Sequence, residues 1–289
     1  MRYRFLRYPG GKAKAVTLSY DDGVPQDIRF AETIEKYGMK CTFNINSGLV
    51  VERVWDGYMT PEEVKHHLLD AGHEIAIHGR FHRAPGVCRP IEVIQEMFKC
   101  RETLEQTFGR IIRGLAYPDS GITNFQNNED YTTVRQILQN LDVAYARTLR
   151  GDNNEFKLPN DWYAWVPTTH HNQPYALDYA KEFVELDMSK TYGAGRWPRL
   201  FYMWGHTYEF DRNNNWEHLE ALCAILGNRD EVWYATNMEI WEYVNAYNSL
   251  VFSADSTMVY NPTLYKIWFE VDGVGYTVEP GQTVTIQDK

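Results

Sequence analysis

Several polar residues that could bind a metal or move a proton follow apolar runs of this 289-residue sequence. Asp21 and Asp22 end the first such run. His78 ends a second, with His82 four residues later, and His206 ends a third. Two histidines and one carboxylate are the ligands of many catalytic zinc sites, which keep one position open for water. The same ligands suit non-haem iron, so the residue types leave the identity of the metal open.

Each of these positions also has an ordinary structural explanation. Asp-Asp-Gly is common in turns, a bare pair of histidines four residues apart is a weak metal signal, and a histidine after an apolar strand is most often structural. On a shared face, a carboxylate that binds no metal could act as a general base and a histidine as a general acid. Four other histidines are expected away from such a site: His66, His67, His73 and His218. His170 and His171 lie beside a long insertion, where contact with a substrate stays open.

The residues that could form a site are far apart in the sequence, so strands and helices must bring them together. Seven short runs enriched in β-branched and aromatic residues predict strands over Ala15–Tyr20, Lys40–Ile45, His73–His78, Ile112–Tyr117, Asp142–Arg147, Arg199–Gly205 and Glu231–Ala235. Amphipathic segments between them predict helices, among them Pro90–Phe108 and one that begins at Thr60. This alternation indicates an α/β fold with a parallel sheet, either open or closed into a barrel. Because parallel strands end at one face, we expect the polar residues at five of the seven strand ends to converge there.

Two segments depart from this alternation. Residues 149–174 are rich in Asn, Asp, Trp and Pro and predict a long loop insertion. After Leu250, four short runs separated by turn sequences predict strands over Val259–Tyr260, Tyr265–Val271, Gly275–Val278 and Thr283–Ile286. We therefore predict a main domain over residues 1–250 and a small β appendage over residues 251–289. The appendage is too short for a core of its own, so it should pack on the main domain.

Composition narrows the possible partners. Lys plus Arg number 29 and Asp plus Glu number 39, and the resulting net charge of −10 disfavours nucleic acid and anionic membranes as partners. No apolar run resembles a signal peptide or a membrane span, and the four cysteines are widely spaced, so we expect reduced thiols in a cytoplasmic protein. Aromatic residues make up 15%, which suits a large core, a stacking surface for sugars, or both. The sequence makes no prediction of oligomeric state.

Sequence motifs around these residues are similar to those of the polysaccharide deacetylase family, also called carbohydrate esterase family 4 or the NodB homology domain. Residues 18–23 read LSYDDG, where the family has an apolar strand ending in TFDDG. Residues 72–78 read GHEIAIH and are followed by His82, as in the second family motif. Cys41-Thr42-Phe43-Asn44 resembles the family's second strand, and residues 203–206, MWGH, resemble its late histidine motif. The resemblance implies a distorted, TIM-like (β/α)7 barrel with the β appendage packed on it.

The resemblance also implies a role for each residue. Asp21 would be the general base and His206 the general acid. The ligands of one divalent metal would be Asp22, His78 and His82. Zinc is expected first, with cobalt, nickel or iron as alternatives. The implied reaction removes an acetyl group from an acetylated carbohydrate, above all an N-acetyl amino sugar, with the oxyanion held by the metal and a backbone N–H near Asp119.

The third family motif, R-x-P-Y, is where this sequence departs most. It aligns with Ala116-Tyr117-Pro118-Asp119, which lacks the arginine that normally pairs with the base. A neighbouring cation lowers the pKa of a carboxylate, so we hypothesise that Arg147, at the end of the next predicted strand, supplies this charge. Tyr117, Pro118 and Asp119 are kept as substrate-side or supporting positions. Trp165 is favoured over Trp162 as a wall of the acetyl pocket.

Two other functions fit the same residues. Relatives of this barrel cleave C–N bonds outside sugars, so an amidohydrolase for a small cyclic amide or imide is the second enzymatic interpretation. The third interpretation is a carbohydrate-binding protein that has lost activity. The presence of all five predicted catalytic and metal-binding residues argues against that loss.

Overall fold

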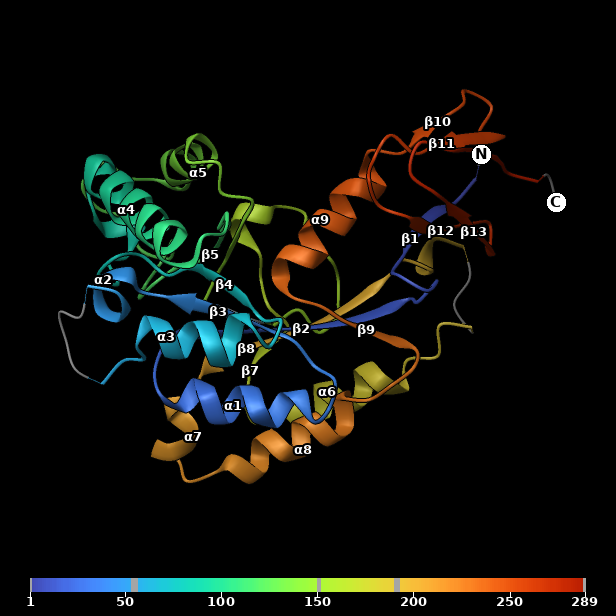
Figure 1. The fold of residues 1–289 in the computed structure, drawn as a ribbon. Coiled ribbons are helices and arrows are strands. Elements are labelled where there is room, and N and C mark those ends of the chain that lie inside the picture. Colours follow the sequence, from blue (N-terminus) through green and yellow to red (C-terminus); the bar gives the residue numbers. More distant parts are fainter. Residues whose placement is uncertain (1, 53–56, 150–151, 190–192, 288–289) are drawn as a thin grey trace.

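The computed structural model describes residues 2–52, 57–149, 152–189 and 193–287. At its centre is a parallel sheet with helices on both sides (Figure 1). Its strands are β2 (Lys14–Asp22), β3 (Cys41–Ile45), β4 (Glu74–Ile77), β5 (Gly114–Ala116), β6 (Tyr145–Arg147), β7 (Thr169–His170), β8 (Arg199–His206) and β9 (Val232–Tyr234). They lie in the order β6-β5-β4-β3-β2-β8-β7, and β9 pairs with the start of β2. The predicted fold class, a distorted (β/α)7 barrel, is confirmed.

The helices between the strands include those that the sequence predicts from Thr60 and over Pro90–Phe108, whereas the helices Ser47–Val50 and Tyr208–Arg212 were not predicted. They are α1 (Gln26–Glu35), α2 (Ser47–Val50), α3 (Pro61–Val64), α4 (Pro90–Phe108), α5 (Tyr131–Asn140), α6 (Ala176–Glu185), α7 (Tyr208–Arg212), α8 (Trp216–Leu226) and α9 (Asn237–Asn248). Helix α4 begins at Pro90, where a missing N–H costs no helical hydrogen bond, and stops at Gly109, which takes a left-handed φ of 64°. Figure 1 shows α4 and α5 on one side of the sheet and α1, α6 and α8 on the other.

The insertion at residues 149–174 contains more structure than a loop. It holds a short helical turn, Trp162–Ala164, and the two-residue strand β7. Trp165 forms an isolated parallel bridge with Arg147 in β6, and the Thr168 amide donates to the carbonyl oxygen of Tyr202 in β8. Within the described ranges no ladder joins β6 to β7, so the backbone of this insertion spans the gap between the two edges of the barrel.

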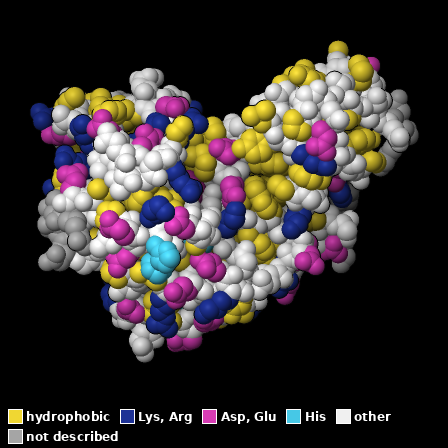
Figure 2. Space-filling view, viewed as in Figure 1, with side chains coloured by type: hydrophobic (Ala, Val, Ile, Leu, Met, Phe, Trp, Pro, Cys, Tyr) yellow, Lys and Arg dark blue, Asp and Glu magenta, His cyan; other side chains and the backbone are white. Residues whose placement is uncertain are grey.

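The C-terminal strands form two small antiparallel sheets. One contains β10 (Val251–Phe252), β11 (Met258–Tyr260) and β14 (Thr283–Thr285), and the other contains β12 (Ile267–Val271), β13 (Val274–Val278) and β1 (Arg4–Arg7). Strand β1 comes from the N-terminal end, so a boundary at residue 250 leaves out one strand of the appendage. The Tyr243 hydroxyl of α9 donates to the carbonyl oxygen of Arg7 at 3.0 Å and accepts from the Trp268 amide at 3.0 Å. Figure 2 shows a notch between the barrel and this C-terminal lobe.

Buried apolar residues form two clusters. The larger lies between the sheet and its surrounding helices and includes Tyr20 and Phe43. The smaller connects the sheet to α9 and the appendage and includes Trp165, Tyr202 and Phe269. Each large buried side chain stabilises the fold by roughly 1.5–3 kcal/mol, so much of the aromatic excess serves the core. Among the described helices, none combines the length and the apolar character needed to cross a membrane.

Candidate active site

The register of the parallel sheet brings the predicted site residues together. Asp21 at the end of β2 lies opposite His206 of β8 on one side and Asn44 of β3 on the other. His78 follows β4, and its amide donates to the carbonyl oxygen of Ile45 at 3.1 Å. These positions all lie at the carboxyl ends of neighbouring strands, the face on which βα proteins build their active sites.

Asp22, His78 and His82 bring three potential metal ligands together. Asp22 Oδ1 lies 3.6 Å from His78 Nε2 and 3.7 Å from His82 Nε2, and all three ligand atoms lie within 4.8 Å of one another. Zinc–nitrogen bonds of about 2.0–2.1 Å place tetrahedral ligand atoms roughly 3.3 Å apart, close to these separations. His78 is buried, whereas the side chains of Asp22 and His82 are 17% and 36% exposed. The group could therefore hold one divalent cation with an open side towards solvent.

The hydrogen bonding of His78 fits a metal ligand. Its Nδ1 lies 2.9 Å from the carbonyl oxygen of Ala116, which can only accept, so Nδ1 carries the proton and Nε2 presents a lone pair. This Nε2 is buried and has no hydrogen-bond partner among the described residues. A buried polar atom without a partner costs about 1–3 kcal/mol, and a second ring nitrogen bonded to a carbonyl is the usual arrangement of a metal-binding histidine. The two nitrogen donors and one carboxylate suit zinc and similar divalent metals.

Left-handed backbone conformations direct two of the ligands. Asp22 and His82 have φ values of 89° and 59°. Such conformations cost roughly 1–3 kcal/mol for a residue other than glycine and occur at sites where the surrounding structure imposes them. Gly23 continues the turn with φ 72°, and a Cβ there would lie 2.8 Å from Cδ1 of Ile45. This turn after β2 therefore needs glycine, and it presents Asp22 to the two histidines.

Asp21 is buried and held through both of its carboxylate oxygens. Arg147 Nη2 donates to Oδ2 at 2.6 Å, and Asn44 Nδ2 donates to Oδ1 at 2.8 Å. Burial alone would raise the pKa of this carboxyl, but Arg147, aided by His78 and His206, outweighs it and lowers the pKa of Asp21. Arg147 thus lies beside Asp21 although the third motif contributes no arginine.

His206, at the end of β8, also faces Asp21. Its Nε2 lies 3.8 Å from Asp21 Oδ2, and its Nδ1 lies 3.6 Å from Glu209 Oε1 in α7. Burial opposes the charged imidazolium, but Glu209 and the carboxylates of Asp21 and Asp22 outweigh it and raise the pKa of His206. No sequence motif had indicated that Glu209 lies beside His206. The available signal was a carboxylate three residues after the histidine, at the start of the following helix.

Glu209 also contacts the two histidines that sequence analysis left open. His170 Nε2 and His171 Nε2 lie 3.2 and 3.3 Å from Glu209 Oε2, a spacing that could also suit a cation. However, the Asn172 amide donates to His170 Nδ1 at 3.1 Å, so neutral His170 carries its proton on Nε2 and has no lone pair there. Burial lowers the pKa of His171 to about 2, which keeps it neutral. Neutral His170 therefore offers no lone pair to a second cation beside Glu209.

The remaining predicted positions lie around this site in different ways. Asp119 is exposed with a φ of 49°, and Pro118 packs near Gly79. Tyr117 is buried, and its hydroxyl donates to the carbonyl oxygen of Tyr163 at 2.8 Å, so it supports the insertion.

Trp165, which we expected to line the acetyl pocket, lies in the core. Trp165 is only 1% exposed and packs against Trp162 and Tyr202 inside the smaller core. Trp204 lies near two of the candidate site residues, with the Arg147 guanidinium 4.3 Å from its ring centre and the His206 ring centre at 5.9 Å. Its strand was predicted, but the sequence alone did not show which face of that strand carries the site.

Comparison with known proteins agrees with this geometry. Residues 3–146 match the model of the polysaccharide deacetylase family, a range that holds Asp21, Asp22, His78 and His82 and ends just before Arg147. No curated protein gives a significant match to the sequence.

Solved structures share the fold at low sequence identity. A protein from Mycobacterium smegmatis assigned as a polysaccharide deacetylase is 17% identical, with a TM-score of 0.56 over 86% of this chain and 96% of that one. The Xyl-CE4 domain of a multidomain xylanase from the hindgut metagenome of Trinervitermes trinervoides is 14% identical, with a TM-score of 0.51 over 81% and 92%. A CE4 family pseudoenzyme from Bacillus anthracis is 17% identical, with a TM-score of 0.50 over 82% and 68%.

Another match is a Streptococcus pyogenes deacetylase in complex with acetate. The matched region spans 46% of this chain and 55% of that protein. Identities this low establish the fold alone, so the assignment rests on the family model together with the motifs at the strand ends. The chain carries a polysaccharide deacetylase domain of the NodB type, a domain of deacetylase-type hydrolases.

Proposed function

We propose that this protein is a metal-dependent deacetylase that hydrolyses the acetyl group of an acetylated carbohydrate, most simply an N-acetyl amino sugar. The arrangement around Asp21 is the observation that carries the proposal. Its Oδ2 lies 3.8 Å from Nε2 of His78 and 3.8 Å from Nε2 of His206. A candidate base therefore lies between a candidate metal ligand and a candidate acid, as hydrolysis of an amide requires.

The residues divide the reaction between them. A divalent cation held by Asp22, His78 and His82 would supply Lewis acidity to the acetyl carbonyl and lower the pKa of a water molecule. Asp21 accepts a proton from the attacking water as the new C–O bond forms. His206 donates a proton to the departing nitrogen as the C–N bond breaks, so acetate and an amine leave. With an O-acetyl group, the proton goes to the departing alcohol oxygen.

The neighbours of the two proton-transfer groups hold them in the required states. The cation of Arg147 keeps Asp21 ionised and ready to accept a proton. The carboxylate of Glu209 favours the protonated form of His206, which is the form that can donate. Opposite charges placed beside the base and the acid therefore separate their pKa values, a recurring feature of sites that use one acid and one base.

The accessible parts of the site suit a substrate much larger than acetate. Asp22, His82 and His206 are each partly exposed, and Asp119, in the segment after β5, is exposed as well. An acetyl group could therefore approach the buried Asp21 while the sugar that carries it stays at the surface. This openness favours a carbohydrate over a small cyclic amide, which would gain more from an enclosed pocket.

The deciding experiment compares two reactions of the zinc-loaded protein. We expect acetate release from N-acetylated oligosaccharides and no ring opening of small cyclic amides or imides. Ring opening without acetate release would instead support an amidohydrolase. Tight binding of metal and oligosaccharide with no acetate release would support an inactive carbohydrate-binding protein and would contradict our proposal.

The two neighbouring aspartates should separate binding from catalysis. Asp21→Asn should retain the metal and lose turnover by about 10²–10⁴-fold, the usual contribution of a general base. Asp22→Asn should lose metal affinity, because it replaces the only carboxylate of the ligand set with a neutral amide. Metal content by elemental analysis, measured beside the turnover rate, checks both. The same behaviour in the two variants would contradict the division of roles.

A further inference from the structure

The candidate metal ligand His82 lies in a loop, residues 79–84, outside the strands and helices of the barrel. Residues 46–48 hold the beginning of this loop through hydrogen bonds to its backbone carbonyl oxygens. The Asn46 side chain donates to the carbonyl oxygens of His78 and Gly79. The Gly48 amide then donates to the next carbonyl oxygen along the chain, that of Arg80, at 2.9 Å. The amide directly before His82 needs a different partner.

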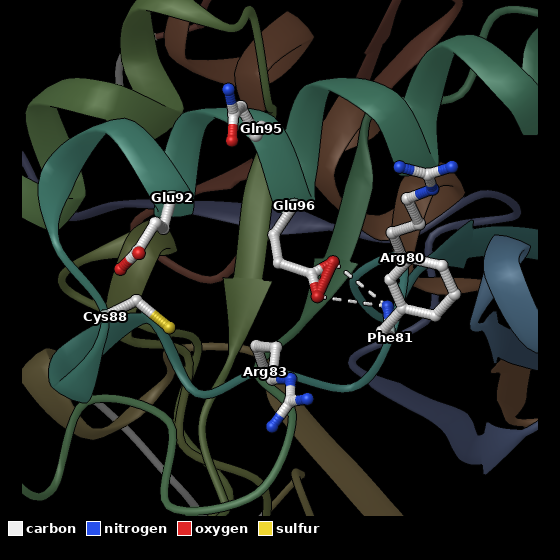
Figure 3. A pocket seen from close by; sticks show the side chains of 7 residues that line it. All are labelled: Arg80, Phe81, Arg83, Cys88, Glu92, Gln95 and Glu96. Atoms are coloured by element: carbon white, nitrogen blue, oxygen red, sulfur yellow. Dashed lines mark hydrogen bonds between the residues drawn. The ribbon is translucent and has the colours of Figure 1, made fainter.

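That partner is a carboxylate on α4. The backbone N–H of Phe81 donates to both oxygens of Glu96, at 3.1 and 3.0 Å. Figure 3 shows the Glu96 side chain extending from α4 to this amide. Glu96 is 8% exposed, and a hydrogen bond to an ionised, largely buried acceptor is stronger than one between neutral groups. The hydrogen bonds from Phe81 to Glu96 fix the position of the peptide directly before His82, the residue with the left-handed φ.

Open space lies beside the hydrogen bond between Glu96 and the Phe81 amide. A cavity of about 410 Å³ is lined by Arg80, Phe81, Arg83, Cys88, Glu92, Gln95 and Glu96. None of the three candidate metal ligands lines this cavity, so it is separate from the candidate metal site. Protein interiors hold a loop by close packing, and a loop bordered by such a cavity could move into it once its hydrogen bond is removed.

We infer that Glu96 is a positioning residue for the metal site, which acts through the Phe81 amide to hold His82 where its Nε2 meets Asp22 and His78. The inference rests on the proposed metal site and extends it to a residue outside the ligand set. Groups that orient metal ligands typically contribute 10–100-fold to metal affinity. Glu96 makes that contribution through the backbone rather than by contact with the imidazole.

The test measures metal affinity directly. Zn²⁺ dissociation constants would be obtained by competition with a chromogenic chelator, and the visible spectrum of the Co²⁺-loaded protein would report ligand geometry. We expect Glu96→Ala to weaken binding by about 10–100-fold and to alter the cobalt spectrum. Glu96→Gln keeps one oxygen acceptor in the same place and should weaken binding less. Glu92→Gln is the matched control, because Glu92 lines the same cavity but bonds to Arg89, so its affinity should equal that of the wild type.

The outcomes separate this inference from the proposed function. Unchanged affinity and cobalt spectrum in both Glu96 variants, with His78→Ala unable to bind, would overturn the role of Glu96 and leave the metal site intact. A lower melting temperature of the metal-free variants with unchanged affinity would overturn it too, because that result describes a purely structural residue. A wild-type protein that binds no metal, or a His78→Ala variant that binds normally, would overturn both.

Discussion

At the scale of single residues, the partner of one ring nitrogen decides what the other can do. His78 and His170 both face a carboxylate on the catalytic side of the barrel. A carbonyl oxygen lies at Nδ1 of His78, so its Nε2 is free to bind a cation. An amide N–H donates to Nδ1 of His170, so the neutral ring carries its proton on Nε2, which lies 3.2 Å from Glu209 Oε2. The same residue type therefore suits a metal ligand in one place and a structural support in the other.

The Arg147 cation should determine where activity falls at low pH. Because Arg147 lowers the pKa of Asp21, Arg147→Met should raise that pKa, and the base should become protonated at a higher pH. The acidic limb of kcat/KM should therefore move to higher pH. Arg113→Met is the control, since Arg113 pairs with Asp142 at the surface. An unmoved acidic limb would show that Arg147 does not control the base.

Glu209 should determine where activity falls at high pH. It raises the pKa of His206, and its own carboxyl stays ionised because the neighbouring histidines, His170 and His206, outweigh burial and lower its pKa. Glu209→Gln should therefore lower the pKa of His206, so that the acid loses its proton at a lower pH. The basic limb of kcat should shift to lower pH, whereas Glu217→Gln, an exposed change on α8, should leave it in place. A basic limb that stays fixed in Glu209→Gln would refute this role.

At the scale of elements, the site depends on close contact between β8 and the segment that follows β7. Gly205 in β8 has no side chain, and His171 occupies the space beside it, so a Cβ at Gly205 would lie 1.9 Å from His171 Nδ1. His171 in turn lies within 3.3 Å of Glu209. A larger side chain at Gly205 of β8 would therefore affect His206, the proposed acid, through His171 and Glu209.

Gly205→Ala should destabilise the fold and disturb this arrangement. Overpacking of a filled core typically costs about 1–3 kcal/mol, and urea unfolding would measure the loss. Gly275→Ala in β13 is the control, because a Cβ there meets nothing within 4 Å, and surface changes of this kind stay within about 0.5 kcal/mol. Equal stability of the two variants would mean that His171 can move away at no cost.

At the scale of the whole molecule, the N-terminal and C-terminal segments of the chain are joined in one sheet. Strand β1 pairs with β12 through four residue pairs, beginning with Arg4 and Val271. Glu270 lies buried at this junction and accepts from Arg7 and Arg196. Opposite charges removed from water are stabilising only as long as they remain paired, so the attachment of the appendage depends on this carboxylate.

Glu270→Ala should weaken the whole molecule more than an exposed ion pair can. Loss of one partner from a buried pair costs about 3–5 kcal/mol, because the remaining charge stays desolvated. The Arg7 and Glu270 side chains are 7% and 6% exposed. The free energy of urea unfolding would measure the effect, beside Glu279→Ala, which removes the exposed pair with Lys266 and should cost about 0–1 kcal/mol. A loss below 1 kcal/mol in Glu270→Ala would show that the junction does not need the pair.

The sequence by itself determined most of the elements and the candidate site residues. Local patterns placed all seven predicted strands, and the helix Pro90–Phe108 has the predicted bounds, because caps, proline, glycine and apolar spacing act over a few neighbouring residues. The rule that parallel strands end at one face was enough to predict that residues such as Asp21 and His206 converge. The motifs around them then suggested the family.

The tertiary structure alone decided which ordinary residues complete the site. Asn44, Glu96 and Glu209 have common residue types and no motif, and their importance comes from contacts made across strands, loops and helices. The structure also placed Trp165 in the core and Trp204 beside the site, and it joined β1 to the C-terminal sheet. Distances between residues far apart in the chain depend on the packing of the whole fold, and no local pattern of the sequence contains them.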